Sequence, residues 1–145
     1  MKAHKFAIGC YVALMQLAVV SVSYAQNPCA APTVVCSPGV ACNGGPGNDV
    51  MMGTPGNDTI YGMGGNDTMC GGGGNDTMYG GPGHDTMYGN PGNDNMYGQD
   101  GNDTMYGQDG VDMLNGGGGG DYCHGGMASD STAAVATCET PVSIP

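Results

Sequence analysis

A nine-residue unit repeats without insertion from residue 44 to residue 124, and it limits the possible folds more than any other feature. Nine good copies stand in tandem, from GGPGNDVMM (44–52) to GGGGGDYCH (116–124). Each copy has Gly at positions 1 and 4 and Asp at position 6, and most have a large apolar residue at position 8. A tenth copy, GGMASDSTA (125–133), keeps the Asp but loses the Gly at position 4. Tandem units of this length predict a solenoid in which each unit stacks on its neighbours.

The conserved positions of the unit indicate calcium. Gly permits positive φ and close backbone approach, so positions 1 and 4 predict a tight turn with its carbonyl oxygens turned inward. Asp at position 6 adds a hard anionic oxygen, and calcium takes six to eight oxygen ligands. The candidate side-chain ligands are Asp49, Asp58, Asp67, Asp76, Asp85, Asp94, Asp103, Asp112 and Asp121. The candidate turn-backbone residues are Gly47, Gly56, Gly65, Gly74, Gly83, Gly92, Gly101, Gly110 and Gly119.

The unit resembles the nonapeptide of the RTX (repeats-in-toxin, hemolysin-type) calcium-binding family, G-G-x-G-x-D-x-U-x with U a large apolar residue. The resemblance implies an all-β parallel β-roll in which two units form one coil and calcium lies between turns 18 residues apart. It gives seven pairs, Asp49/Asp67, Asp58/Asp76, Asp67/Asp85, Asp76/Asp94, Asp85/Asp103, Asp94/Asp112 and Asp103/Asp121. An eighth pair, Asp112/Asp130, would use the degenerate tenth copy. About seven Ca²⁺ ions would nearly balance the 13 acidic residues.

Other metals fit this pattern less well. His84 and His124 do not share a repeat position, so a site for a soft or borderline metal is not indicated. Magnesium demands a tighter octahedron than carbonyl-rich turns offer. Six of the nine residues at position 8 are Met, which are soft copper(I) ligands, but flexible Met side chains are better explained as filling for a thin core.

The last three residues of each unit, such as Thr77-Met78-Tyr79, predict a short strand whose middle side chain points inward. The inward row contains only nine residues, too few to offset the conformational entropy of ordering the roll. We therefore expect the metal-free chain to be largely disordered and its folding to be coupled to calcium binding.

Charge and composition exclude several classes of partner and activity. Lys2 and Lys5 are the only basic residues, which argues against binding to nucleic acid and to anionic membranes and favours cations. The sequence offers no Ser/His/Asp or Cys/His set, and the Asp residues are committed to metal. We therefore predict that the chain is not an enzyme.

The N-terminal 25 residues predict a signal peptide with a basic start, an apolar stretch from Phe6 to Val22 and small residues before Gln26. An uncleaved membrane anchor is the alternative, but the apolar stretch is marginal for a span. The sequence thus divides into a signal peptide (1–25), a Cys/Pro-rich N-terminal cap (26–43), the β-roll (44–133) and a C-terminal tail (134–145), and we expect secretion or display on the cell surface.

Six cysteines remain after the signal peptide, an even number that suggests disulfides in an exported protein. Cys29, Cys36 and Cys42 precede the repeats, and Cys138 follows them. Cys70 could tie the cap to the third repeat and Cys123 could join Cys138, although all 15 connectivities remain open.

The outward positions 7 and 9 carry rows of Thr and Tyr, which favour β-strands and cross-strand packing. The same rows could form a flat surface for adhesion, self-association or ice. Position 3 is Pro, Gly or Asp, which departs from the ice-binding pattern of some RTX-type solenoids. We expect a structural or adhesive module. The alternative is an RTX-type appendage for secretion or folding without its own activity, although no catalytic segment precedes the repeats here.

Overall fold

The computed structural model describes residues 28–126 and residue 138, and all its regular structure is β. One sheet contains β1 (Val34–Val35), β3 (Val50–Met52), β5 (Thr68–Cys70), β7 (Thr86–Tyr88), β9 (Thr104–Gln108) and β11 (Tyr122–Gly126). The other contains β2 (Cys42–Asn43), β4 (Thr59–Tyr61), β6 (Thr77–Pro82), β8 (Asn95–Asp100) and β10 (Met113–Gly118). The signal peptide, the tenth repeat beyond Gly126 and all of the tail except Cys138 lie outside the described residues.

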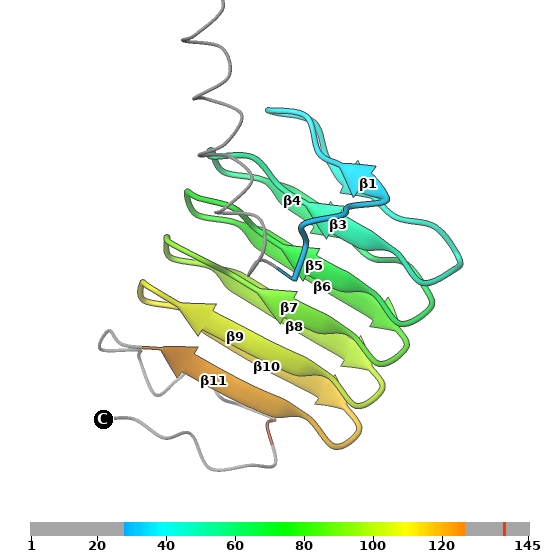
Figure 1. Cartoon of the computed structure of the whole chain (residues 1–145). Coiled ribbons are helices and arrows are strands. Elements are labelled where there is room, and N and C mark those ends of the chain that lie inside the picture. The colour runs from blue at the N-terminus through cyan, green and yellow to red at the C-terminus, as the bar shows by residue number, and fades with distance from the viewer. Residues whose placement is uncertain (1–27, 127–137, 139–145) are drawn as a thin grey trace, which may run out of the picture.

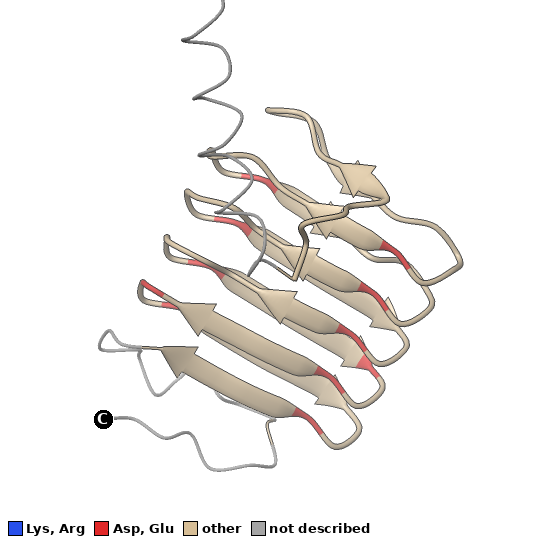
Figure 2. Cartoon of the chain, viewed as in Figure 1, with Lys and Arg blue, Asp and Glu red and all other residues tan. Residues whose placement is uncertain are grey.

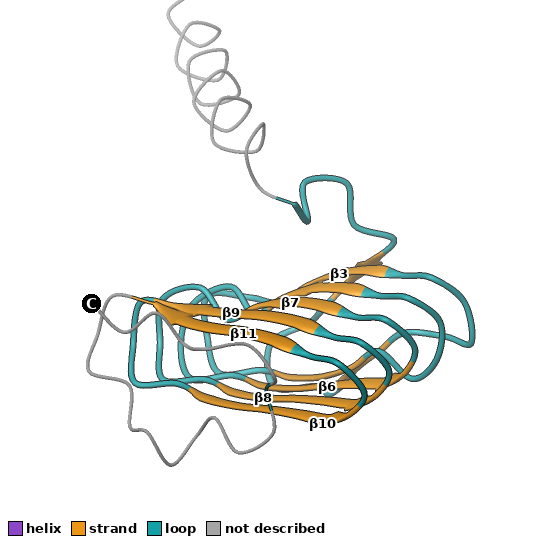
Figure 3. Cartoon of the chain, turned by 90° about the horizontal axis from the view of Figure 1, so that it is seen from below, coloured by secondary structure: helices purple, strands orange, loops and turns teal. Residues whose placement is uncertain are grey.

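Successive strands alternate between the two sheets, so the chain winds as a flat solenoid of about five coils (Figures 1 and 3). Every strand pair is parallel, and the repeats pair in a register of 18 residues, as Thr59 with Thr77 and Thr77 with Asn95. Two nine-residue units therefore make one coil. The all-β parallel β-roll predicted from the repeat is confirmed.

Each strand forms where β-branched and aromatic residues flank the apolar position 8, and Gly-rich turns end it. Several strands extend beyond the three predicted residues, and β6 reaches Pro82. The extension arises because successive turns superimpose, so that their backbones continue to pair, as Gly81 with Gln99. In the same stretch the N–H of Gly83 donates to the carbonyl oxygen of Asp100 at 2.8 Å.

The core is a single row of side chains from position 8, enclosed between the two sheets. All members of this row are at most 2% exposed. They are Met51, Ile60, Met69, Met78, Met87, Met96, Met105, Leu114 and Cys123. The predicted inward row is confirmed. No helix that could span a membrane occurs in residues 28–126.

Three disulfides join Cys29 to Cys70, Cys36 to Cys42 and Cys123 to Cys138. The first attaches the N-terminal segment to the third repeat, as expected. Cys70 occupies an outward strand position, yet it is only 1% exposed. The N-terminal segment also supplies β1 and β2, which pair with β3 and β4 and so add one strand to each sheet.

The outward faces carry stacked aromatic rings. The rings of Tyr61, Tyr79 and Tyr97 are spaced at 5.0 Å with interplanar angles of 6° and 9° on one sheet. Tyr88 and Tyr106 stack in the same way at 5.1 Å on the other. Parallel strands in register place identical side chains one above another, so each Tyr row becomes a column.

Candidate metal centre

The turns that connect the two sheets hold the acidic residues, which gather along both edges of the roll (Figure 2). Each repeat Asp directly precedes a strand by one residue, as Asp76 precedes β6. From Asp67 onward, each of them except Asp112 is at most 1% exposed, and Asp112 is 2% exposed. Asp58 is 5% exposed, whereas Asp49, in the first repeat, is half-buried.

Carboxylates 18 residues apart are connected directly along each edge. The backbone N–H of each Asp donates to the carboxylate Oδ1 of the Asp in the next coil, at 2.8 to 2.9 Å. The bonds within the described residues run from Asp49 to Asp67, Asp58 to Asp76, Asp67 to Asp85, Asp76 to Asp94, Asp85 to Asp103, Asp94 to Asp112 and Asp103 to Asp121. These are the seven pairs expected from the sequence. The eighth pair would need Asp130, which lies outside the described residues.

The second carboxylate oxygen is buried without compensation. Within residues 28–126, no hydrogen bond reaches Oδ2 of Asp67, Asp76, Asp85, Asp94, Asp103 or Asp121. The sequence has no Lys or Arg after residue 5 to pair with these groups. An ionised oxygen removed from water without a partner is costly, so a cation or a proton is required at each of them.

Burial changes the acidity of these groups in the metal-free fold. It is the main cause that raises the pKa of Asp76 to about 7 and that of Asp85 to about 6. In both cases the N–H bond from the previous coil opposes the rise, and neighbouring carboxylates add to it. Burial also raises the pKa of Asp67, Asp94 and Asp103.

The glycines at positions 1 and 4 have different roles. At position 4, the predicted positive φ is found at Gly65, Gly74, Gly83, Gly92, Gly101, Gly110 and Gly119, but not at Gly47 or Gly56. At position 1 the expectation of positive φ is wrong, because no glycine of this row has it. There the requirement is space: a Cβ at Gly80 would strike Asp85 Oδ2 and would lie 2.7 Å from the carbonyl oxygen of Gly98.

Position 2 is a structural determinant that the sequence reasoning missed. From the third repeat onward it adopts positive φ, including the non-glycine residues Met63, Asn90, Gln99 and Gln108. The mixture of Gly, Asn and Gln at this position was the available signal, because Gly and Asn tolerate this conformation better than most residues.

Position 5 forms a second ladder that was also missed. Its side-chain acceptors receive the backbone N–H of the same position one coil further on, as Asn75 N–H to Asn57 Oδ1 at 2.8 Å. His84 takes part through Nδ1, which accepts from Asn102 N–H at 2.8 Å. The frequency of Asn at position 5 was the sequence signal, since its amide oxygen can accept from backbone N–H groups.

Comparison with known proteins agrees with this geometry. The model of the RTX calcium-binding nonapeptide repeat (4 copies) matches residues 43–78, 79–114 and 97–131. The chain belongs to this family. No curated protein and no solved structure matched the RTX chain.

RTX repeats bind Ca²⁺ in general, and the turns of this RTX chain suit such an ion. Within the described residues, no group of three or more His, Cys, Asp or Glu side chains converges on one point. An ion here would therefore need backbone carbonyl oxygens in addition to the Asp carboxylates. The orphaned Oδ2 atoms supply the anionic part of such an all-oxygen shell, which is the donor chemistry that calcium prefers.

Proposed function

We propose that this RTX chain is an exported calcium-binding β-roll whose folding is coupled to calcium binding, and that it acts as a structural or adhesive module outside the cell. The observation that carries the proposal is the row of buried carboxylate oxygens that lack a hydrogen-bond donor within the described residues. About seven ions, one between each pair of stacked turns, would neutralise them.

Coupling to folding follows from the same row. Without metal, each coil must bury carboxylates whose ionised form is destabilised, while the only core is one row of side chains. Calcium bound to the folded state alone would stabilise that state by mass action. Far-UV circular dichroism should therefore show strand signal in millimolar calcium and its loss in excess chelator. The same strand signal under both conditions would contradict the coupling.

Isothermal titration calorimetry tests the number of ions, and fewer than about five per chain would contradict stacked turns. Asp85→Asn is the informative variant, because it keeps Oδ1 for the N–H of Asp67 but removes the charge. We expect it to lose calcium, since Asp85 belongs to two pairs. Asp100→Asn removes the same charge at an exposed turn position and is the matched control, with uptake close to that of the wild type. Equal uptake by the two variants would argue against the assigned ligands.

Export and an extracellular role are supported by the three disulfides and by the N-terminal sequence. N-terminal sequencing of the protein recovered outside the cell should begin at Gln26. The Thr and Tyr columns offer two regular faces for self-association or for contact with a surface. Analytical ultracentrifugation in calcium tests this role: filaments would support assembly, and release as a monomer would count against a surface adhesin.

A further inference from the structure

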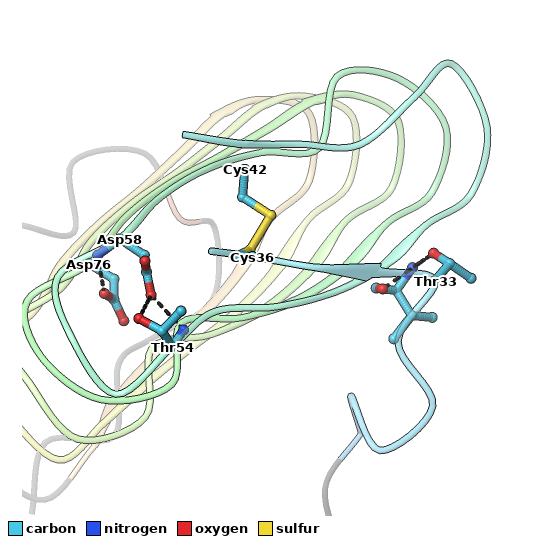
Figure 4. The surroundings of a disulfide bond; sticks show 7 residues. Thr33, Cys36, Cys42, Thr54, Asp58 and Asp76 are labelled. Carbon is cyan, nitrogen blue, oxygen red and sulfur yellow. Dashed lines mark hydrogen bonds between the residues drawn. A yellow bond between two sulfur atoms is a disulfide. The ribbon is translucent and has the colours of Figure 1, made fainter. Parts of the chain in front are cut away.

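The two edges of the roll end differently at the N-terminal side. On one edge, Asp49 is fully satisfied: Thr33 Oγ1 donates to its Oδ1 at 3.2 Å, and Gly45 N–H donates to its Oδ2 at 2.7 Å. On the other edge, Asp58 Oδ2 accepts from the N–H and the hydroxyl of Thr54 at 2.6 and 2.8 Å. Figure 4 shows Thr33 and Asp58 at opposite edges, with the Cys36–Cys42 disulfide between them.

Asp58 differs from the Asp residues that follow it in which oxygen is left over. Its Oδ1 is the atom that is buried without a hydrogen-bond partner in residues 28–126, whereas in the later repeats it is Oδ2. In those repeats, Oδ1 receives an N–H from the residue 18 positions earlier, as Asp76 receives that of Asp58. For Asp58 the donor would be Val40, because Cys42 pairs with Ile60 in the same register.

Val40 does not donate to Asp58. The loop closed by Cys36 and Cys42 turns its N–H back to the carbonyl oxygen of Ser37 at 3.2 Å. Between this loop and the first complete coil lies an open pocket of about 330 Å³. Gly39, Val40 and Ala41 line it from the loop, and Asn57, Asp58 and Tyr61 line it from the coil.

We propose that this pocket binds one further calcium ion through Asp58 Oδ1, in a site that no pair of repeat turns forms. Every polar group in the lining is an oxygen donor or a backbone or side-chain amide, with no thiolate or imidazole, so a hard cation is favoured. The volume is about ten times that of one water molecule, so the ion keeps part of its water shell and fills this site after the stacked turns. The inference rests on the proposed function in that the ion is counted beside those of the repeats.

Val40→Lys tests the site in the full disulfide-bonded chain. Val40 is 62% exposed, so lysine can be accommodated, and its ammonium would replace the cation at Asp58 Oδ1 while every carboxylate stays in place. Val35→Lys is the matched control, since Val35 is 69% exposed on the same segment but does not line the pocket. Calcium titration by calorimetry should show one bound ion fewer for Val40→Lys than for the wild type and for Val35→Lys.

The outcomes separate this inference from the function on which it rests. Equal stoichiometry in all three proteins would overturn the pocket site and leave calcium binding by the repeats intact. An equal loss in both lysine variants would also overturn it, because added charge alone would then explain the effect. No calcium uptake by the wild type would overturn the proposed function and the pocket site together.

Discussion

At the scale of single residues, the glycine at position 1 is required because it leaves room for the metal-binding carboxylate. Gly80→Ala would place a Cβ against Asp85 Oδ2 and the carbonyl oxygen of Gly98. We expect a loss of about 1–3 kcal/mol in the free energy of unfolding of the calcium-loaded form, the usual cost of overpacking. Chemical denaturation in saturating calcium measures it.

Gly47→Ala is the control for this prediction. A Cβ at Gly47 meets nothing within 4 Å, and its φ is not positive. The alanine should therefore leave stability within about 0.5 kcal/mol of the wild type. Equal losses in both variants would show that glycine is needed for a reason other than the space beside the Asp carboxylate.

At the scale of the elements, the turns are held to one another by ladders that run along each edge. The ladder of position 5 includes Asn75 Oδ1, which accepts the N–H of Asn93 at 2.9 Å. Asn75→Ala removes this acceptor in an exposed turn, so water can replace it. We expect a loss of at most about 1 kcal/mol in the free energy of unfolding in calcium.

Val111→Ala is the matched change in the same row, since valine has no acceptor for the next coil. It should alter stability less than Asn75→Ala does in the same denaturation experiment. If the two variants were equally stable, the side-chain ladder would contribute nothing, and the turns would be stacked by backbone bonds and metal alone.

At the scale of the whole molecule, the buried carboxylates give the metal-free fold an unusual dependence on pH. Because burial raises the pKa of Asp76 to about 7 and of Asp85 to about 6, the folded state binds protons that the unfolded chain releases near pH 4. The stability of the metal-free fold is therefore greatest below about pH 4 and decreases as pH rises through about 6 to 7.

Acidification of calcium-free protein from pH 7 to pH 5 should thus increase the strand signal in far-UV circular dichroism. Sedimentation at each pH separates folding from aggregation near the calculated pI of 4.1. In excess calcium the dependence should reverse, because protons compete with the ion for the carboxylates. A metal-free strand signal that decreases on acidification would contradict the assigned burial.

The disulfides also act on the whole chain, through the entropy of the unfolded state. Cys29 and Cys70 are separated by 41 residues, and Cys36 and Cys42 by 6. Replacing the first pair with serine should cost about 4 kcal/mol, and replacing the second about 2 kcal/mol. Denaturation in saturating calcium gives both values, and the reverse order would show that local packing outweighs loop entropy.

The sequence alone determined the coil and the paired carboxylates, because a strict period of nine leaves few ways to stack identical turns. It determined Met78 as core and Asp76 as an edge residue by their phase in the repeat. The phase could not reveal that Gly80 serves the carboxylate of Asp85 by its lack of a Cβ, since that contact depends on how the turn folds back.

Only the tertiary structure decided what happens where the repeat ends. Val40 lies at the Asp phase but outside the repeat pattern, so its period carried no information about its N–H. Its orientation follows from the Cys36–Cys42 loop, and that orientation leaves Asp58 Oδ1 without a donor among the described residues. Periodicity predicts contacts between equivalent residues, whereas the contacts of the first coil join unlike segments and depend on their packing.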